Sequence, residues 1–239
     1  MAPASAIIYA SLGGIVPALF WLLFLLREDA RSPEPKQIIA LTFLVGMAAV
    51  LLTLPLEHYA CMHLGGCGQP TPKLVIVAWA FIEEVLKYGV VAAAILWRKC
   101  VDEPIDLVIY MLTAALGFAA LENTLFLIAP LTSGHVWDGF LTGNLRFIGS
   151  TLLHVVASSA IGFAMGFSFK RPRAIRIFIS TGGLILAIAL HTIFNFLIIS
   201  EDGSTTLAAF FSVWTGIIVF FALFEILKSY EYRYLKINS

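Results

Sequence analysis

Long apolar stretches separated by short polar ones run along the whole chain. A helix needs about 20 mostly apolar residues to cross a bilayer. Seven stretches reach that length: Ala4–Leu26, Gln37–Leu56, Leu74–Trp97, Ile105–Ala129, Phe147–Phe169, Ala174–Ile199 and Thr206–Leu227. The pattern therefore predicts an all-α fold, a polytopic transmembrane helix bundle of about seven spans, with residues 1–239 in a single integral membrane domain.

Composition narrows the class of protein. The chain is 60% hydrophobic and 13% charged, whereas a typical soluble domain is about 45–50% apolar and about 25% charged. We therefore expect a multi-pass protein of a cell membrane that is surrounded by the lipid bilayer. The formal net charge is zero, so nothing in the electrostatics favours a nucleic acid partner.

The distribution of basic residues predicts the orientation. Cytoplasmic loops carry an excess of Lys and Arg, and 12 of the 15 such residues fall in alternate connections and the C-terminal tail. These are Arg27, Arg31, Lys36, Arg98, Lys99, Lys170, Arg171, Arg173, Arg176, Lys228, Arg233 and Lys236. Only Lys73 and Arg146 fall in the other loops, and Lys87 lies inside a span. We therefore expect the N-terminus outside and the C-terminus in the cytoplasm.

Four of the predicted helices carry ionisable or amide groups in their apolar interior. An ionisable group at bilayer depth costs about 2.5–3.5 kcal/mol or more, so it usually faces a bundle interior or a wet cavity and serves a function. The groups are Glu83, Glu84 and Lys87 in the third stretch, Glu122 and Asn123 in the fourth, His154 in the fifth, and His191 and Asn195 in the sixth.

Depth along each helix indicates that these groups meet. At a rise of about 1.5 Å per residue, the ionisable groups of all four helices lie roughly 11–13 Å below the outer surface. His191 and Asn195 share a helix face because they are four residues apart. We expect one site in the outer half of the membrane, within a catalytic four-helix core formed by residues 74–199.

The residue types suit hydrolysis of a carbonyl compound, with a peptide bond as the leading candidate. A carboxylate removed from water is a better proton acceptor, so Glu83 or Glu84 could activate water. His154 could hold that water or carry protons, and His191 with Asn195 could donate hydrogen bonds to an oxyanion. Adjacent glutamates point about 100° apart around a helix, so only one of them faces the site squarely.

A metal-dependent version of this site is equally open. His154, His191 and a glutamate would form a His₂Glu site for zinc or another divalent metal, with a position left for water. The HExxH signature of many zinc proteases is absent from the sequence. Supporting roles fall to Lys87, Glu122, Asn123 and Arg146. Arg146 lies at the outer mouth above His154, as an interface anchor or as a substrate contact.

Four motifs in this order resemble a known family. They are Glu83-Glu84-x-x-Lys87, Gly117-x-x-x-x-Glu122-Asn123, His154 with Gly162 eight residues on, and His191-x-x-x-Asn195. Together they resemble the PrsW family of intramembrane proteases and, more distantly, the CAAX-processing and bacteriocin-processing proteases. The first motif ends in Lys, not in the Arg typical of the CAAX proteases, which argues against a prenylated substrate.

The resemblance implies a substrate and a division of roles. A member of this family would be an endopeptidase that cleaves a single-pass membrane protein, such as an anti-sigma factor, near its extracytoplasmic side. The resemblance also favours Glu83 as the residue that activates water. Glu84 would then be its partner, held in place by Lys87.

Other functions compete with proteolysis. The main alternative is a proton-coupled transporter, since intramembrane Glu and His chains also relay protons. That alternative predicts inverted repeats or broken helices, and the sequence shows no such symmetry. A retinal-binding receptor needs a lysine in its last helix, and Thr206–Leu227 contains none. A serine protease built on Ser158 or Ser159 is a further alternative.

Two connecting segments carry weaker signals. The outer loop with His58, Cys61, His63 and Cys67 could bind a metal, form one disulfide, or do neither. The stretch from Pro130 to Arg146 contains Trp137 and Phe140, so it is expected to lie along the outer interface of the membrane.

Overall fold

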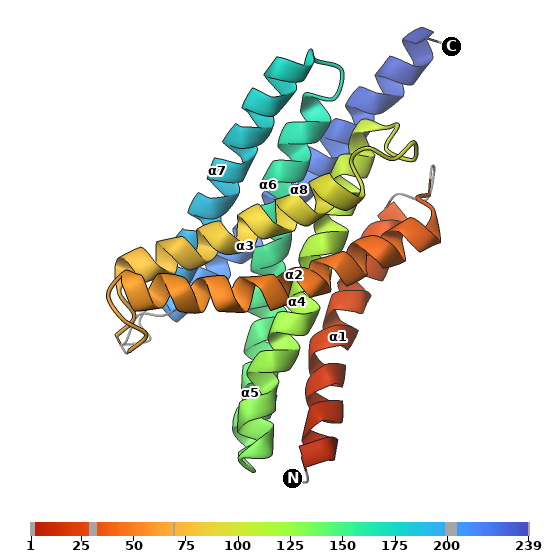
Figure 1. The fold of residues 1–239 in the computed structure, drawn as a ribbon. Helices are drawn as coiled ribbons and strands as arrows, with labels where there is room; N and C mark the ends of the chain where they lie inside the picture. Colours follow the sequence, from red (N-terminus) through yellow and green to blue (C-terminus); the bar gives the residue numbers. More distant parts are fainter. Residues whose placement is uncertain (1–2, 29–32, 69, 199–204, 239) are drawn as a thin grey trace.

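The computed structural model describes residues 3–28, 33–68, 70–198 and 205–238 (Figure 1). Arg31 and Ile199, which the sequence assigned to a loop and to a helix end, lie outside the described residues. Within these ranges every regular element is a helix, which confirms the all-α prediction. The elements are α1 (Pro3–Glu28), α2 (Lys36–His63), α3 (Lys73–Ala94), α4 (Pro104–Thr132), α5 (Val136–Leu145), the π-helix η1 (Arg146–Ser150), α6 (Thr151–Phe167), α7 (Arg173–Ile198) and α8 (Thr206–Asn238).

Six of the described helical segments are long and apolar enough to cross a membrane. They comprise α1, α2, α4, the continuous segment from α5 through α6, α7 and α8. α3 has 22 residues, which is also a spanning length, but its middle carries Glu83, Glu84 and Lys87. With α3 included, the described part of the chain has seven long helical segments, as the apolar pattern predicts.

α4 is the central helix of the bundle. It packs against α1, α2, α3, α6 and α8, and nearly all its residues from Pro104 to Ala120 are buried. In Figure 1, α2 and α3 lie side by side and cross the steeper helices α4 and α6 obliquely. Glycines allow the crossing of α2 over α4, because a Cβ at Gly46 would collide with the carbonyl of Ala114, and one at Gly117 with the carbonyl of Phe43. The α2–α3 pair is thereby held tightly against α4.

α2 is longer than the sequence predicted. Its apolar run ends at Leu56, but the helix continues to His63, so the interpretation of residues 57–63 as loop is wrong. A helix is held by backbone hydrogen bonds and does not require apolar side chains. Polar residues outside the bilayer centre can therefore continue the helix. Cys61 therefore lies in the last turns of α2, where it forms a disulfide with Cys67. Of the three outcomes left open for this loop, the structure contains the disulfide.

The stretch from Pro130 to Arg146 is not an interfacial segment, so that prediction is wrong. α4 continues through Pro130 to Thr132, the chain turns at Gly134 with φ of 83°, and α5 returns along α4. α5 then runs into α6 through η1 (Figure 1). Trp137 and Phe140 stack on each other with ring centroids 5.5 Å apart. These aromatic residues belong to a helical hairpin that extends the bundle.

Candidate active site

Lys87 is the centre of a buried ion cluster on α3. Its Nζ lies 2.8 Å from Glu84 Oε1 and 3.2 Å from Glu83 Oε2, because one helical turn separates Lys87 from both acids. Lys87 and Glu84 are 0% exposed and Glu83 is 5% exposed. The ammonium also lies 4.2 Å from the centroid of the Phe118 ring on α4. Since two carboxylates share one ammonium, α3 alone leaves a negative charge unbalanced.

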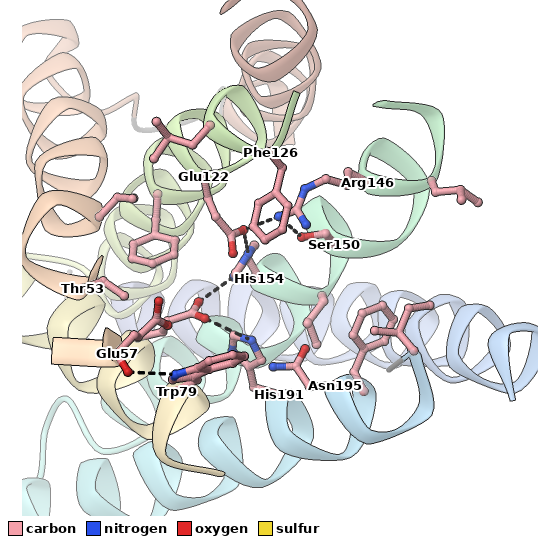
Figure 2. A pocket seen from close by; sticks show the side chains of 18 of the residues that line it. Thr53, Glu57, Trp79, Glu122, Phe126, Arg146, Ser150, His154, His191 and Asn195 are labelled. Atoms are coloured by element: carbon pink, nitrogen blue, oxygen red, sulfur yellow. Dashed lines mark hydrogen bonds and ion pairs between the residues drawn. The ribbon is translucent and has the colours of Figure 1, made fainter. Parts of the chain in front are cut away.

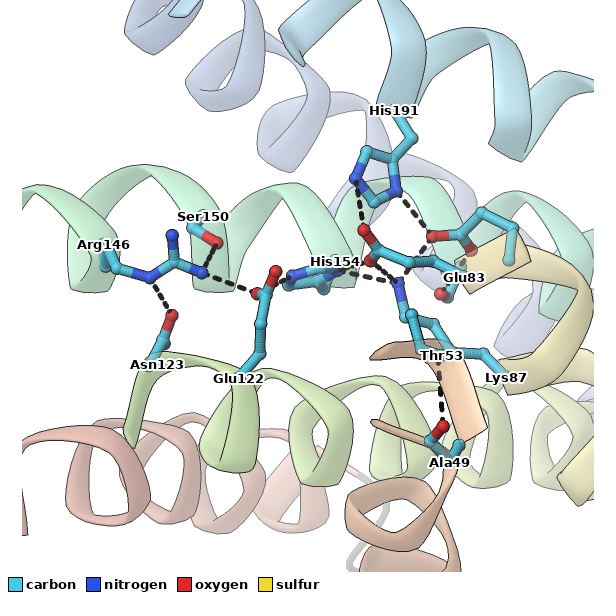
Figure 3. A network of polar contacts seen from close by, with 12 residues as sticks. Ala49, Thr53, Glu83, Lys87, Glu122, Asn123, Arg146, Ser150, His154 and His191 are labelled. Carbon is cyan, nitrogen blue, oxygen red and sulfur yellow. Dashed lines mark hydrogen bonds and ion pairs between the residues drawn. The ribbon is translucent and has the colours of Figure 1, made fainter. Parts of the chain in front are cut away.

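The two histidines reach this cluster from α6 and α7 (Figure 3). His154 Nδ1 lies 2.8 Å from Lys87 Nζ, and His191 Nδ1 lies 2.9 Å from Glu84 Oε1. The imidazole rings are edge to face, with centroids 5.3 Å apart. Glu83 faces both rings, at 3.9 Å from His154 Nδ1 and 3.8 Å from His191 Nε2. Helices α3, α6 and α7 thus bring together residues that lie far apart in the sequence.

A second set of polar contacts continues from His154 toward the C-terminal half of α4. His154 Nε2 lies 3.0 Å from Glu122 Oε2, and the same oxygen accepts a hydrogen bond of 2.6 Å from Arg146 Nη2. Arg146 Nε donates to Asn123 Oδ1 at 2.6 Å. Asn123 Nδ2 in turn donates to Thr151 Oγ1 at 2.9 Å. All four residues that the sequence assigned to support, Lys87 included, belong to one network.

The two glutamates of α3 have different surroundings. Glu84 is enclosed: Oε1 contacts Lys87 and His191, and Oε2 accepts a hydrogen bond of 2.9 Å from Ser158. Glu83 instead lines a cavity, as do both histidines. Ser158 donates to a carboxylate, not to an imidazole, which is not the arrangement of an activated serine nucleophile.

The cavity has a volume of about 550 Å³ and is lined by α2, α3, α4, η1, α6, α7 and α8 (Figure 2). Apolar side chains form most of its wall, including Val50, Leu54, Leu125, Phe126 and Phe194. The polar groups that line it are Thr53, Glu57, Thr71, Trp79, Glu83, Glu122, Arg146, Ser150, His154, His191, Asn195 and Thr206. Such a mostly apolar cavity with a few convergent polar groups is typical of a binding or catalytic site.

Asn195 shares the cavity wall with His191 but takes no part in the network. It lies one turn after His191 on α7 and makes no hydrogen bond with other described residues. Figure 2 shows it beside His191 at the cavity wall. Its amide is therefore available to a molecule in the cavity.

Glu57 is a cavity residue that sequence reasoning missed. It lies on α2, and it lines the same cavity as Glu83. Trp79 Nε1 donates to the Glu57 backbone carbonyl at 3.2 Å, which ties α2 to α3 at this level. The apolar stretch ended at Leu56, so Glu57 looked like the first loop residue. Continuing the helix by one residue would have placed it on the same face as Thr53.

The charges of the site favour a bound cation. Three carboxyl groups, Glu83, Glu84 and Glu122, are paired with only two basic side chains, Lys87 and Arg146. Glu83, His154 and His191 each offer a ligand atom, and these atoms lie within 4.8 Å of one another. Two imidazoles and a carboxylate are the donor set of His₂Glu catalytic zinc sites. The residues therefore fit a divalent metal in type, in burial and in charge.

Comparison with known proteins agrees with this geometry. The family model of PrsW family intramembrane metalloproteases matches residues 34–226, a range that contains every residue of the network and cavity described above. A protein named Protease PrsW from Geobacillus kaustophilus is 27% identical over 194 residues, which is 79% of either chain.

Further relatives carry the same name. Protease PrsW from Bacillus subtilis is 25% identical over 189 residues, or 77% of this chain and 80% of that protein. Protease PrsW from Clostridioides difficile is 23% identical over 194 residues, 78% of either chain. No solved structure matches the chain significantly.

Proposed function

Because the chain belongs to the PrsW family of intramembrane metalloproteases, we propose that the cavity around Glu83 is where it hydrolyses a peptide bond of a membrane-embedded substrate. The protein is a peptide hydrolase with several membrane-spanning helices, and it resides in a cell membrane. The observation that carries the proposal is that Glu83 alone of the α3 pair lines the cavity, facing both His154 and His191.

Glu83 is proposed to activate water. One of its oxygens would accept a proton from the water while the water oxygen attacks the scissile carbonyl carbon. The proton would then pass to the leaving amine nitrogen as the C–N bond breaks. Glu84 would position Lys87 and His191, to which it is already bonded.

His191 and Asn195 are proposed to stabilise the oxyanion. Both side chains project from one face of α7 into the cavity, and the Asn195 amide has no competing partner among the described residues. Donors aimed at a developing oxyanion are usually the largest single catalytic contribution. His154, held between Lys87 and Glu122, would keep Lys87 in place beside Glu83.

In the metal-dependent version of this site, Glu83, His154 and His191 would instead hold a divalent metal, with zinc as the first candidate. Glu83 and His191 would then act as metal ligands in place of the roles of proton acceptor and oxyanion donor. When bound, such a cation would polarise the scissile carbonyl and make water a better nucleophile at neutral pH. The family description supports a metal, as do the surplus of carboxyl groups and the donor set. Residues 74–199 would then be the catalytic four-helix core, because they supply all three ligands.

The proposed substrate is a single-pass transmembrane protein of the anti-sigma-factor type, cleaved near the extracytoplasmic face. Support comes from the resemblance of the motifs and from the depth of the site in the outer half of the membrane. The transporter alternative has no comparable support, since the matched family and relatives are proteases.

Reconstitution tests this function. Purified protein in liposomes should cleave a co-reconstituted single-pass substrate, and a strong chelator should abolish cleavage until metal is restored. Metal analysis of the purified protein should find about one divalent ion per chain, as a single catalytic site requires. Cleavage that is equally fast in wild type and Glu83→Gln would overturn the proposal.

A further inference from the structure

Arg146 is placed in the cavity by an irregular helical turn. Residues Arg146–Ser150 form the π-helix η1 between α5 and α6, and π-helical turns occur frequently at functional sites. The Arg146 backbone carbonyl accepts the backbone N–H of Thr151 and also, at 3.1 Å, the hydroxyl of the same residue. The Arg146 side chain lines the cavity and is 17% exposed.

The guanidinium group is fixed on three sides. Nε donates to Asn123, and Nη2 donates to Glu122 and, at 3.1 Å, to Ser150. One face of the group lies 3.9 Å from the centroid of the Phe126 ring, within the range of a cation–π contact. Such a set of contacts holds the plane of Arg146 in one orientation, at little further entropic cost when a ligand binds.

Nη1 is the one nitrogen of the Arg146 guanidinium group that takes no part in these contacts. Within the described part of the chain it has no hydrogen-bond partner, and Figure 3 shows it pointing away from Asn123 and Glu122. A charged N–H donor in a mostly apolar cavity binds an oxygen acceptor strongly. Arg146 therefore offers an empty, oriented donor to whatever occupies the cavity.

The charges around Arg146 select the kind of acceptor. Glu122 already neutralises the guanidinium at 2.6 Å, and Glu83, Glu84 and Glu122 outnumber the ammonium and guanidinium groups of Lys87 and Arg146. A further carboxylate would be repelled, whereas a neutral carbonyl oxygen would not.

We propose that Arg146 is a substrate-binding residue whose Nη1 donates to a backbone carbonyl of the substrate segment beside the scissile bond. The proposal rests on the proposed function of the cavity as a peptidase site. The contact would hold an unwound, extended stretch of substrate against η1, with its neighbouring peptide bond near Glu83. The contact with Arg146 would give the enzyme little sequence specificity, because every substrate residue presents a backbone carbonyl.

Steady-state kinetics with a co-reconstituted single-pass substrate test this contact. Arg146→Gln should raise KM by about 10-fold to 100-fold, as expected for loss of a hydrogen bond from a charged group, with kcat nearly unchanged. Arg146→Lys should not restore the affinity, because an ammonium cannot bind Glu122, Asn123 and the substrate together. Arg173→Gln, at the exposed start of α7, is the matched control and should behave as wild type.

The substrate side supplies a second test that does not depend on the variant folding. Backbone carbonyls around the scissile bond are replaced by thioamides, one at a time, and cleaved by the wild-type enzyme. One position should show a raised KM, and Arg146→Gln should remove that difference. An equal KM at every position, or an unchanged KM in Arg146→Gln, overturns the contact. Dependence on an acidic substrate side chain instead of a carbonyl also overturns it.

Failure of the contact is distinguishable from failure of the proposed function. If wild type cleaves and Glu83→Gln does not, the peptidase proposal stands whatever Arg146→Gln does. If wild type and Glu83→Gln are both inactive on membrane substrates, the proposal that the cavity is a peptidase site is wrong, whatever the role of Arg146. The contact could then still be tested by binding, because a thioamide that weakens the affinity of the substrate for Glu83→Gln would indicate the hydrogen bond to Arg146.

Discussion

At the scale of single residues, the two adjacent glutamates of α3 should have separable effects. Glu83→Gln keeps the size and hydrogen-bonding capacity of the side chain but removes the proton acceptor. We expect kcat to fall by about 10²-fold to 10⁴-fold while the substrate still binds. The measurement is cleavage of a reconstituted substrate, together with co-purification of the uncleaved substrate.

Glu84→Gln is the matched comparison, since it alters the neighbouring residue in the same way. Glu84 contacts Lys87, His191 and Ser158 but does not line the cavity. The change should chiefly lower thermal stability in detergent, because it weakens a buried ion pair, and part of the turnover should remain. An inactive but fully stable Glu84→Gln beside an active Glu83→Gln would reverse the assignment.

The two histidines should act as one unit. His154→Ala and His191→Ala are each expected to abolish cleavage, because both rings face Glu83. The double variant should lose little more than either single one, since members of one catalytic group are not additive. Rate losses that multiply would instead mean two independent contributions. Membrane insertion of each variant is the necessary control.

Glu57 should influence metal binding. It lines the same cavity as Glu83, and neighbours of a metal ligand typically change metal affinity by about 10-fold to 100-fold. Glu57→Gln should weaken zinc binding by that factor in a competition assay with a chromophoric chelator. Glu225→Gln, which removes an exposed pair with Lys228 on α8, should leave zinc affinity unchanged.

The sequence predicted most of the residues of the site, but not which of them contact one another. An ionisable residue within an apolar stretch is conspicuous because its transfer into the bilayer costs free energy. Glu83, His154 and His191 were identified for this reason. Glu57 escaped because it lies at the end of an apolar run, where charge costs little. Which of Glu83 and Glu84 faces the cavity depends on the rotation of α3 against α4 and α7, and a single sequence does not contain that rotation.

At the scale of helices, the crossing of α2 over α4 should tolerate no added methyl group. Gly117→Ala would drive a Cβ into the backbone of Phe43, and Gly46→Ala would do the same to Ala114. We expect each to cost about 1–3 kcal/mol of stability through overpacking, measured by thermal denaturation in detergent. Gly89→Ala on α3 has open space around its Cβ and should be neutral or slightly stabilising.

Helix existence was easier to predict than helix extent. Apolar runs located every spanning rod, because the bilayer demands about 20 apolar residues from each. They gave the wrong end for α2 and missed α5, since helices that leave the bilayer centre no longer need apolar side chains. Glycines such as Gly46 and Gly117 carried no signal, because their role depends on a neighbouring helix.

At the scale of the whole molecule, the orientation can be tested with thiol chemistry. The basic residues place Cys100 on the cytoplasmic side and the Cys61–Cys67 disulfide outside. A membrane-impermeant maleimide applied to intact cells should label nothing at first. After mild reduction it should label Cys61 or Cys67, whereas Cys100 should react only in opened cells. Labelling of Cys100 from outside would reverse the topology.

The charge carried by α3 has a consequence for how the protein is made. α3 is the one of the seven predicted helices that is not among the six candidate membrane spans. Its middle carries Glu83, Glu84 and Lys87, and each unpaired charge at bilayer depth disfavours transfer into lipid. Its acids pair with Lys87 on the same helix and also contact His154 on α6 and His191 on α7, which are synthesised later. The proposed cutting site therefore cannot be complete until α7 has been synthesised. A chain that ends before α7 is expected to be inactive.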